Sequence, residues 1–143
     1  MSDDLDAMLR EASERIGLQT SCSVIVRMDG ALARVASSDA RSAACDEAEV
    51  AERGGPCVLA LDQLAGVIVP DVATERRWPA WVEAARAAGF RSGAALPAYV
   101  GGGVAAALNL YSVQVDPWDA DALVTADHYV QAVADVIREQ GLT

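Results

Sequence analysis

The segment at residues 104–113, VAAALNLYSV, constrains the fold most, because it is apolar on both sides of a strand. Alternate side chains of a strand point to opposite faces of its sheet. The two faces would carry Val104, Ala106, Leu108 and Leu110 on one side, and Ala105, Ala107, Asn109 and Tyr111 on the other. Neither face suits contact with water. The segment is therefore predicted to be a central strand covered by a layer of structure on each side.

Local signals place the other elements around this strand. Apolar periodicity and glycine stops predict helices at residues 3–17, 40–53, 56–64, 79–88 and 117–140. A hairpin is expected within residues 21–39, a short edge strand in 66–72 limited by Pro70, and a second hairpin across 90–113. This order predicts an α+β fold, with a central antiparallel sheet of about five or six strands. The terminal helices would cover one face of the sheet and the middle helices the other.

Aspartates and glycines mark the ends of these elements. Asp29 and Gly30 form the dipeptide that a tight hairpin turn prefers, since both central residues need a positive φ. Asp39 is predicted to cap the helix at 40–53. Asp116 is predicted to cap the last helix, with Pro117 in its first turn.

Size and charge exclude several classes of protein. The 143 residues suit a single domain, and we expect no separate output domain within residues 1–143. The formal net charge is −10, and all eleven basic residues are arginines, so direct binding to nucleic acid is not expected. No apolar run reaches the roughly 18 residues of a membrane span, and the N-terminus is acidic and amphipathic. We expect a cytoplasmic protein.

The sequence gives little support for a metal-binding site. Cys22, Cys45 and Cys57 form no CxxC pair, and His128 is the one histidine, so zinc spacings are missing and free thiols are expected. The acidic runs DDLD, DEAE and DADA fall near predicted helix starts, where they are interpreted as solvated caps and not as metal ligands. The sequence contains no metal or nucleotide motif and leaves the cofactor unknown, with an unidentified small-molecule ligand as the candidate.

The segment at residues 70–93, PDVATERRWPAWVEAARAAGFRSG, carries most of the candidate binding residues. Trp78 and Trp81 lie three apart at a helix start, and smaller alanines continue their face. They are candidates either for ligand contact or for anchoring this helix in the core. Asp71 would orient a ligand or pair with Arg76 or Arg77, and these two arginines are expected to fasten the segment to nearby carboxylates.

Cys57, in the first turn of a predicted helix, has two interpretations. In the first, the helix dipole lowers the pKa of the thiol, and Cys57 acts as a redox or covalent sensor. In the second, Cys57 is a small apolar residue packed in the core. Asn109 and Tyr111 are expected to be structural in the sheet, with Asn109 bonded to loop backbone. The alanines of the two central strands suggest a cavity.

Several fragments in order resemble the GAF family, particularly the actinobacterial chains that precede ANTAR RNA-binding domains. They are VASSD, GGPCVLAL, VPDVATERRWPAW, AAGFRSGAALPA and AALNLYS, and they place a GAF-like core at about residues 6–138. The resemblance implies a small-molecule pocket between the sheet and the middle helices, with Arg91 and Ser92 at its rim. Related chains often carry an acidic residue just before Gly-Pro-Cys, and RGGPC has none.

The resemblance implies a non-catalytic sensor for a small molecule or redox state, acting in signal transduction or transcriptional control. A homodimer through the terminal helices is expected, along with a possible separate signalling partner. The residues expected at the dimer contact are Leu5, Met8, Val130, Val133 and Ile137. One alternative is a protein-interaction module with a vestigial pocket. Another is a thiol enzyme similar to the free methionine-(R)-sulfoxide reductases, whose second cysteine is missing from DVATERRW.

Overall fold

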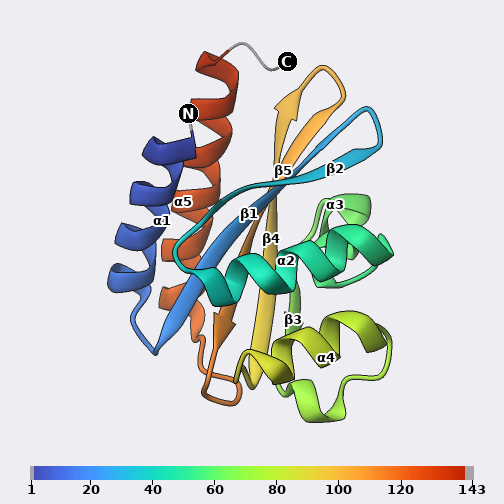
Figure 1. The fold of residues 1–143 in the computed structure, drawn as a ribbon. Coiled ribbons are helices and arrows are strands. Elements are labelled where there is room, and N and C mark those ends of the chain that lie inside the picture. The colour runs from blue at the N-terminus through green and yellow to red at the C-terminus, as the bar shows by residue number, and fades with distance from the viewer. Residues whose placement is uncertain (1, 141–143) are drawn as a thin grey trace.

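The sheet has five antiparallel strands in the order β2-β1-β5-β4-β3 (Figure 1). The computed structural model describes residues 2–140 of the chain. The strands are β1 (Thr20–Met28), β2 (Ala31–Ser37), β3 (Val67–Val69), β4 (Ser92–Gly101) and β5 (Val104–Ser112). β5 lies in the middle, and each of its nine residues is buried. The prediction of a central strand covered on both faces is confirmed.

The helices form a layer on each side of the sheet, as predicted (Figure 1). α1 (Ser2–Ile16) and α5 (Ala120–Glu139) pack on one face. The other face is covered by α2 (Ala40–Glu52), α3 (Pro56–Gln63) and α4 (Pro79–Ala87). A short 3-10 helix, η1 (Val72–Thr74), follows β3 and was not predicted. The α+β architecture is confirmed.

The apolar stripes of the terminal helices are used inside the chain. Leu5, Val130 and Val133 are fully buried in the core beneath α1 and α5, Ile137 is nearly so, and Met8 is half-buried against the same core. Four of the five side chains expected at a dimer contact therefore pack against the chain's own sheet. A dimer through these helices would have to use their outward-facing residues.

The three features predicted from aspartates have different outcomes. Asp39 caps α2 as predicted, by accepting a hydrogen bond from the Ser42 amide at 2.9 Å. Asp29 and Gly30 both have positive φ, 51° and 88°, and they join β1 to β2 as expected. The predicted cap of the last helix is wrong, because the helix begins three residues later. Asp119 caps α5 by accepting a hydrogen bond from the Ala122 amide at 2.9 Å. Asp116 instead lies in a left-handed turn whose amide donates to the Pro70 carbonyl.

The small residues of the central strands bring a helix close to the sheet. Ala95, Ala105 and Ala107 are buried against α3, in a cluster that includes Ala60 and Leu61. The cavity that these alanines suggested is therefore occupied by α3 at this place. None of the helices within residues 2–140 has the length and apolar character needed to cross a membrane.

Candidate functional site

Two carboxyl side chains of α2 are buried against the sheet. Asp46 is fully buried and Glu49 is 1% exposed. With Ser42 and Cys45 they occupy the inward face of the helix, at a spacing of three and four residues. The interpretation of DEAE as a solvated cap is therefore wrong for Asp46 and Glu49. The spacing of these four residues was the sequence signal that could have indicated a buried helix face.

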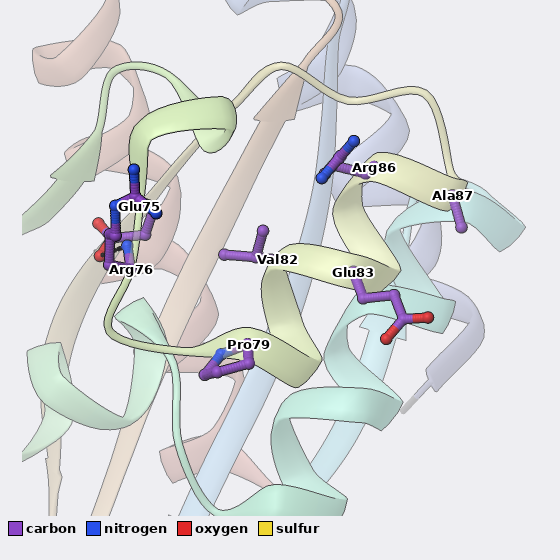
Figure 2. A pocket seen from close by; sticks show the side chains of 7 residues that line it. All are labelled: Glu75, Arg76, Pro79, Val82, Glu83, Arg86 and Ala87. Carbon is purple, nitrogen blue, oxygen red and sulfur yellow. Dashed lines mark hydrogen bonds between the residues drawn. The ribbon is translucent and has the colours of Figure 1, made fainter.

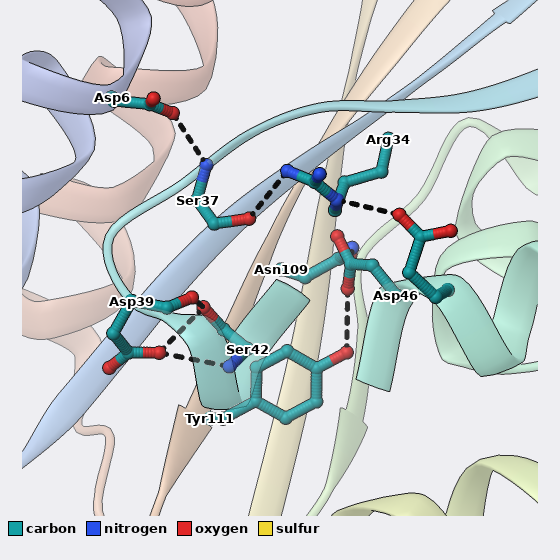
Figure 3. A network of polar contacts seen from close by, with 9 residues as sticks. Asp6, Arg34, Ser37, Asp39, Ser42, Asp46, Asn109 and Tyr111 are labelled. Carbon is teal, nitrogen blue, oxygen red and sulfur yellow. Dashed lines mark hydrogen bonds and ion pairs between the residues drawn. The ribbon is translucent and has the colours of Figure 1, made fainter. Parts of the chain in front are cut away.

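Asp46 is the centre of a hydrogen-bond network that joins three elements. Figure 3 shows its contact with Tyr111 of β5. Its Oδ1 atom accepts from Asn109 Nδ2 at 3.1 Å and from the Tyr111 hydroxyl at 2.8 Å, both on β5. The Tyr111 hydroxyl in turn accepts from Trp81 Nε1 of α4 at 3.2 Å. Asn109 thus bonds a side chain of α2 and not loop backbone, which corrects the expectation for this residue. The network connects α2, β5 and α4.

Glu49 caps the start of α3. Its Oε2 atom accepts from the Val58 amide at 3.0 Å, and the positive end of a helix favours a carboxyl there. A side chain at Gly55 would overlap the Glu49 carboxyl, so this corner needs a glycine. RGGPC lacks an acid of its own, but Glu49 supplies one from the preceding helix.

Burial changes the acidity of both carboxyls. Removal from water raises the pKa of Asp46 to about 7, although its hydrogen bonds act in the opposite direction. Burial and the neighbouring Asp46 raise the pKa of Glu49 to about 8. Both groups therefore titrate close to neutral pH.

Three polar atoms beside Asp46 lack a hydrogen-bond partner of good geometry. They are Asp46 Oδ2, Asn109 Oδ1 and Ser23 Oγ. Ser23 and Asn109 are directly paired on neighbouring strands, and Ser23 lies close enough to lower the pKa of Asp46. Buried polar atoms are normally satisfied in folded proteins. These buried polar atoms belong to one group of neighbouring side chains, here called the acid cluster (Ser23, Asp46, Glu49, Asn109 and Tyr111), which is the candidate binding centre.

Aromatic rings stand beside the acid cluster. The Trp81 and Tyr111 rings lie 6.1 Å apart between centroids, and Phe90 stacks on Tyr111 at 5.0 Å. Trp78 meets Trp81 edge to face at 6.3 Å and is half-buried, whereas Trp81 is 1% exposed. Trp81 is thus a core anchor of α4, and Trp78 lies at the surface of the aromatic group.

A hollow of about 180 Å³ opens between the end of α2 and the start of α4. Its lining residues are Glu52, Gly54, Arg77, Trp78, Pro79, Ala80 and Trp81. The Arg77 guanidinium lies 4.2 Å from the centre of the Trp78 ring and pairs with Glu75, as expected for this arginine. This hollow, here called the tryptophan hollow, is separated from the acid cluster by Trp81.

A larger hollow of about 760 Å³ lies beside α4 (Figure 2). It is lined by Glu75, Arg76, Pro79, Val82, Glu83, Arg86 and Ala87. Figure 2 shows Glu83 turned away toward α2, while Val82 faces the loop that precedes α4. None of its lining residues belongs to the acid cluster.

Three predicted rim residues have structural contacts. Asp71 Oδ1 lies 3.5 Å from Arg91 Nη2 and also accepts from the Ala73 amide at the start of η1. Ser92 is buried, and its hydroxyl donates to the Gln114 carbonyl at 2.7 Å. The structure brings Asp71 and Arg91 together, but none of the three contacts the acid cluster by a hydrogen bond or ion pair among residues 2–140. Asp71 therefore forms an intramolecular pair, but with Arg91 and not with the expected Arg76 or Arg77.

The cysteines are free and buried. Burial raises the pKa of the Cys57 thiol well above its usual value, and the nearby Glu49 adds to the effect. The interpretation of Cys57 as a core residue is thus supported over that of a sensor with a lowered thiol pKa. Within residues 2–140, no three histidine, cysteine or acidic side chains are grouped so as to hold a metal ion.

Several solved structures share the fold of this chain at low sequence identity. The GAF domain of a two-component sensor histidine kinase from Bacillus halodurans has a TM-score of 0.69 at 12% identity, covering 98% of this chain and 95% of that chain. GAF3 of Slr1393 from Synechocystis sp. PCC6803, in its photoproduct state, has a TM-score of 0.73 at 14% identity, covering 98% and 94%.

A third similar structure is an enzyme. The type II free methionine-R-sulfoxide reductase from Thermoplasma acidophilum has a TM-score of 0.69 at 13% identity, covering 96% of this chain and 92% of that chain. No curated protein matches the sequence significantly. The family model of the GAF domain matches residues 2–138. The chain therefore belongs to the GAF domain family.

Proposed function

We propose that this GAF domain is a non-catalytic regulatory sensor that binds a small molecule between α2 and α4. The observation that carries the proposal is the acid cluster, which holds unpartnered buried atoms and whose Tyr111 is bonded to Trp81, a residue that lines the tryptophan hollow. A ligand entering from the hollow would displace or reorient Trp81. The buried polar atoms would then gain partners.

The route from ligand to signal follows the same contacts. Trp81 belongs to α4, and its hydrogen bond to Tyr111 joins α4 to the central strand. A ligand that binds one position of Trp81 more tightly than the other would shift the population of α4 positions. This supports a role in signal transduction or transcriptional control in the cytoplasm, with output to a separate domain or partner. The motif likeness to chains that precede ANTAR domains points to transcriptional control.

The state of the thiols supports a binding role over thiol chemistry. A nucleophilic cysteine needs a thiolate and access, whereas Cys57 is fully buried with a raised pKa. The fold of a sulfoxide reductase is shared, but fold alone does not carry an activity.

Native mass spectrometry of freshly purified protein tests the proposal. We expect a bound mass, or ligand-induced stabilisation in a thermal-shift screen, that the Trp81→Ala variant loses. The same spectra report whether the domain is the expected homodimer. Absence of any bound or stabilising small molecule, together with an unchanged Trp81 environment, would favour the interaction-module alternative.

A further inference from the structure

We infer that the ligand of this site carries a small primary ammonium group, bound at the acid cluster, with its apolar part in the tryptophan hollow. The inference rests on the proposed function, since it names the ligand class of the same site. It is carried by the types of polar atom that lack partners and by the aromatic rings beside them.

The atoms without partners require a hydrogen-bond donor. Asn109 Oδ1 can only accept, and so can Asp46 Oδ2 when the carboxyl is ionised. Ser23 Oγ can accept as well. An ammonium group has three donors and no acceptor, so it can supply donors to these oxygens without adding another acceptor. A carboxylate or phosphate ligand would add further acceptors and would repel Asp46 and Glu49.

Charge favours the same ligand. Asp46 and Glu49 lie three residues apart on α2, and each is almost completely buried. A buried carboxylate is stable only when paired or hydrogen-bonded. Asp46 is involved in no ion pair within residues 2–140, and the arginine that influences its pKa, Arg34, is bonded to Glu47. A ligand cation would supply the missing counter-charge.

The aromatic rings suit a cation with a short apolar part. Tyr111 belongs to the acid cluster and Trp81 borders it, and ring faces attract ammonium groups at short range. The tryptophan hollow holds about 180 Å³, below the 300 Å³ or more that is typical of drug-sized ligands. Gly54 lines the hollow, and its neighbour Gly55 leaves room for the Glu49 carboxyl. The ligand is therefore expected to be small.

Proton release should accompany binding, because the acid cluster without a ligand holds protons near neutral pH. The groups that face Asp46 and Glu49 come from every neighbouring element. They are Ser23 of β1, Arg34 of β2, Cys45 of α2, Cys57 of α3, Asn109 and Tyr111 of β5, and Trp81 of α4, which acts on Tyr111. Burial and nearby acids raise the pKa of Cys45, Cys57 and Tyr111, so these groups stay neutral. Asp46 and Glu49 are thus the groups that would lose protons to bind a cation.

The test uses tryptophan fluorescence of the full chain in a Trp118→Phe background. Trp118 lies on the opposite face, where its Nε1 donates to Thr20 Oγ1, so the remaining emission comes from Trp78 and Trp81. Propylammonium chloride, propionate and propanol are titrated at matched ionic strength to about 50 mM, because a ligand of four heavy atoms is limited to weak affinity. We expect saturable change with propylammonium alone. Its affinity should rise up to about tenfold per pH unit from pH 5.5 to 7 and level off above pH 8.5.

Two variants locate the ammonium group. Asp46→Asn should weaken propylammonium binding at least about tenfold and flatten its pH dependence, since a buried ionic contact of this size is lost. Glu47→Gln removes the same charge from the exposed side of α2 and should change neither. Circular dichroism checks that both variants fold. Equal binding by Asp46→Asn and the parent protein would overturn the inference.

The outcomes also separate this inference from the proposed function. If propionate or propanol binds saturably and propylammonium does not, the proposed small-molecule site stands and the assignment of an ammonium ligand is refuted. No response to any of the three, with only the chain's own mass in native spectra, would refute both. A propylammonium response that is independent of pH in the parent protein would overturn the assignment to Asp46 and Glu49.

Discussion

The ring of Trp81 lies against the backbone of Gly93, so that a Cβ atom at position 93 would come within 2.9 Å of two ring carbons. Gly93 is in β4, directly opposite Tyr111 of β5, whose hydroxyl accepts from Trp81. The absence of a side chain at this position lets the indole lie flat against the sheet and reach the network.

Gly93→Ala should therefore destabilise the domain through Trp81. We expect a loss of about 1–3 kcal/mol in the free energy of unfolding, because the rigid ring must shift within a packed core. Urea unfolding measures it. Trp81→Phe removes the clashing ring atoms, so the double variant should lose less stability than the sum of the single changes. If the loss of stability in the double variant equals the sum of the two single losses, the two residues do not contact each other.

Stability should fall as pH rises through the neutral range. The folded pKa values of Asp46 and Glu49, about 7 and 8, lie above their ordinary values of 3.8 and 4.5. Between about pH 4 and 8 the folded protein therefore holds more protons than the unfolded chain, and its free energy of unfolding decreases with increasing pH. The lowered pKa values of Asp39 and Glu75 act in the opposite direction, but only below about pH 4.5.

Thermal unfolding of ligand-free protein from pH 5 to 8.5 measures this dependence. Asp46→Asn with Glu49→Gln should reduce the slope, and each pKa unit corresponds to about 1.4 kcal/mol. Glu47→Gln should keep the slope of the parent, since Glu47 is exposed. A double variant as sensitive to pH as the parent would contradict the assignment.

The three thiols should be unreactive in the folded protein. Cys22, Cys45 and Cys57 are each fully buried, and burial raises the pKa of Cys22 and Cys45 to about 12. Iodoacetamide at pH 8, followed by mass spectrometry, should give three adducts in urea and few without it. Rapid and selective labelling of Cys57 in the folded state would instead support thiol chemistry.

Arg91→Ala should leave both stability and ligand binding almost unchanged. Its side chain is 52% exposed and lies 3.5 Å from Asp71, and exposed pairs of this kind contribute about 0–1 kcal/mol. Asp71→Ala should cost more, about 1 kcal/mol, because Asp71 also caps η1. Paired urea unfolding curves compare the two variants. A loss of ligand binding in Arg91→Ala alone would return this arginine to the pocket rim.

The expected homodimer can be tested on the outward face of α5. Val124 is 56% exposed, whereas Val133 of the same helix is fully buried. Val124→Glu should leave the fold intact and weaken a dimer that uses this face, as measured by light scattering. Val133→Glu should unfold the domain, because it buries an unpaired charge. An unchanged dimer in Val124→Glu would place the contact elsewhere.

Short-range patterns predicted the elements that depend on neighbouring residues. The turn at Asp29 and Gly30 and the cap at Asp39 are set by side chains within three residues of the backbone they satisfy. The prediction that Asp116 caps the last helix was wrong because Asp119 is an equally good cap. Which of the two aspartates caps the helix depends on long-range packing. Trp118 enters the core before the helix can begin, where it bonds Thr20.

The candidate site was missed because it depends on which side of α2 meets the sheet. The run that contains Asp46 was interpreted as a solvated cap near a helix start, but Asp46 lies in the middle of α2, on the side that faces the sheet. Its partners Asn109 and Tyr111 are more than sixty residues away in the chain. Trp81, by contrast, was a candidate because two tryptophans in a chain with few aromatic residues are noticeable locally.

The Glu49 carboxyl at the start of α3 has a consequence for comparing sequences within the family. An alignment column placed immediately before Gly-Pro-Cys would score this chain as having lost its acid. The carboxyl is nevertheless present in space, contributed from one helix earlier and bonded to the amide of Val58. Sorting family members by that column would record no acid for this chain, whereas sorting by three-dimensional position would record the Glu49 carboxyl at this corner.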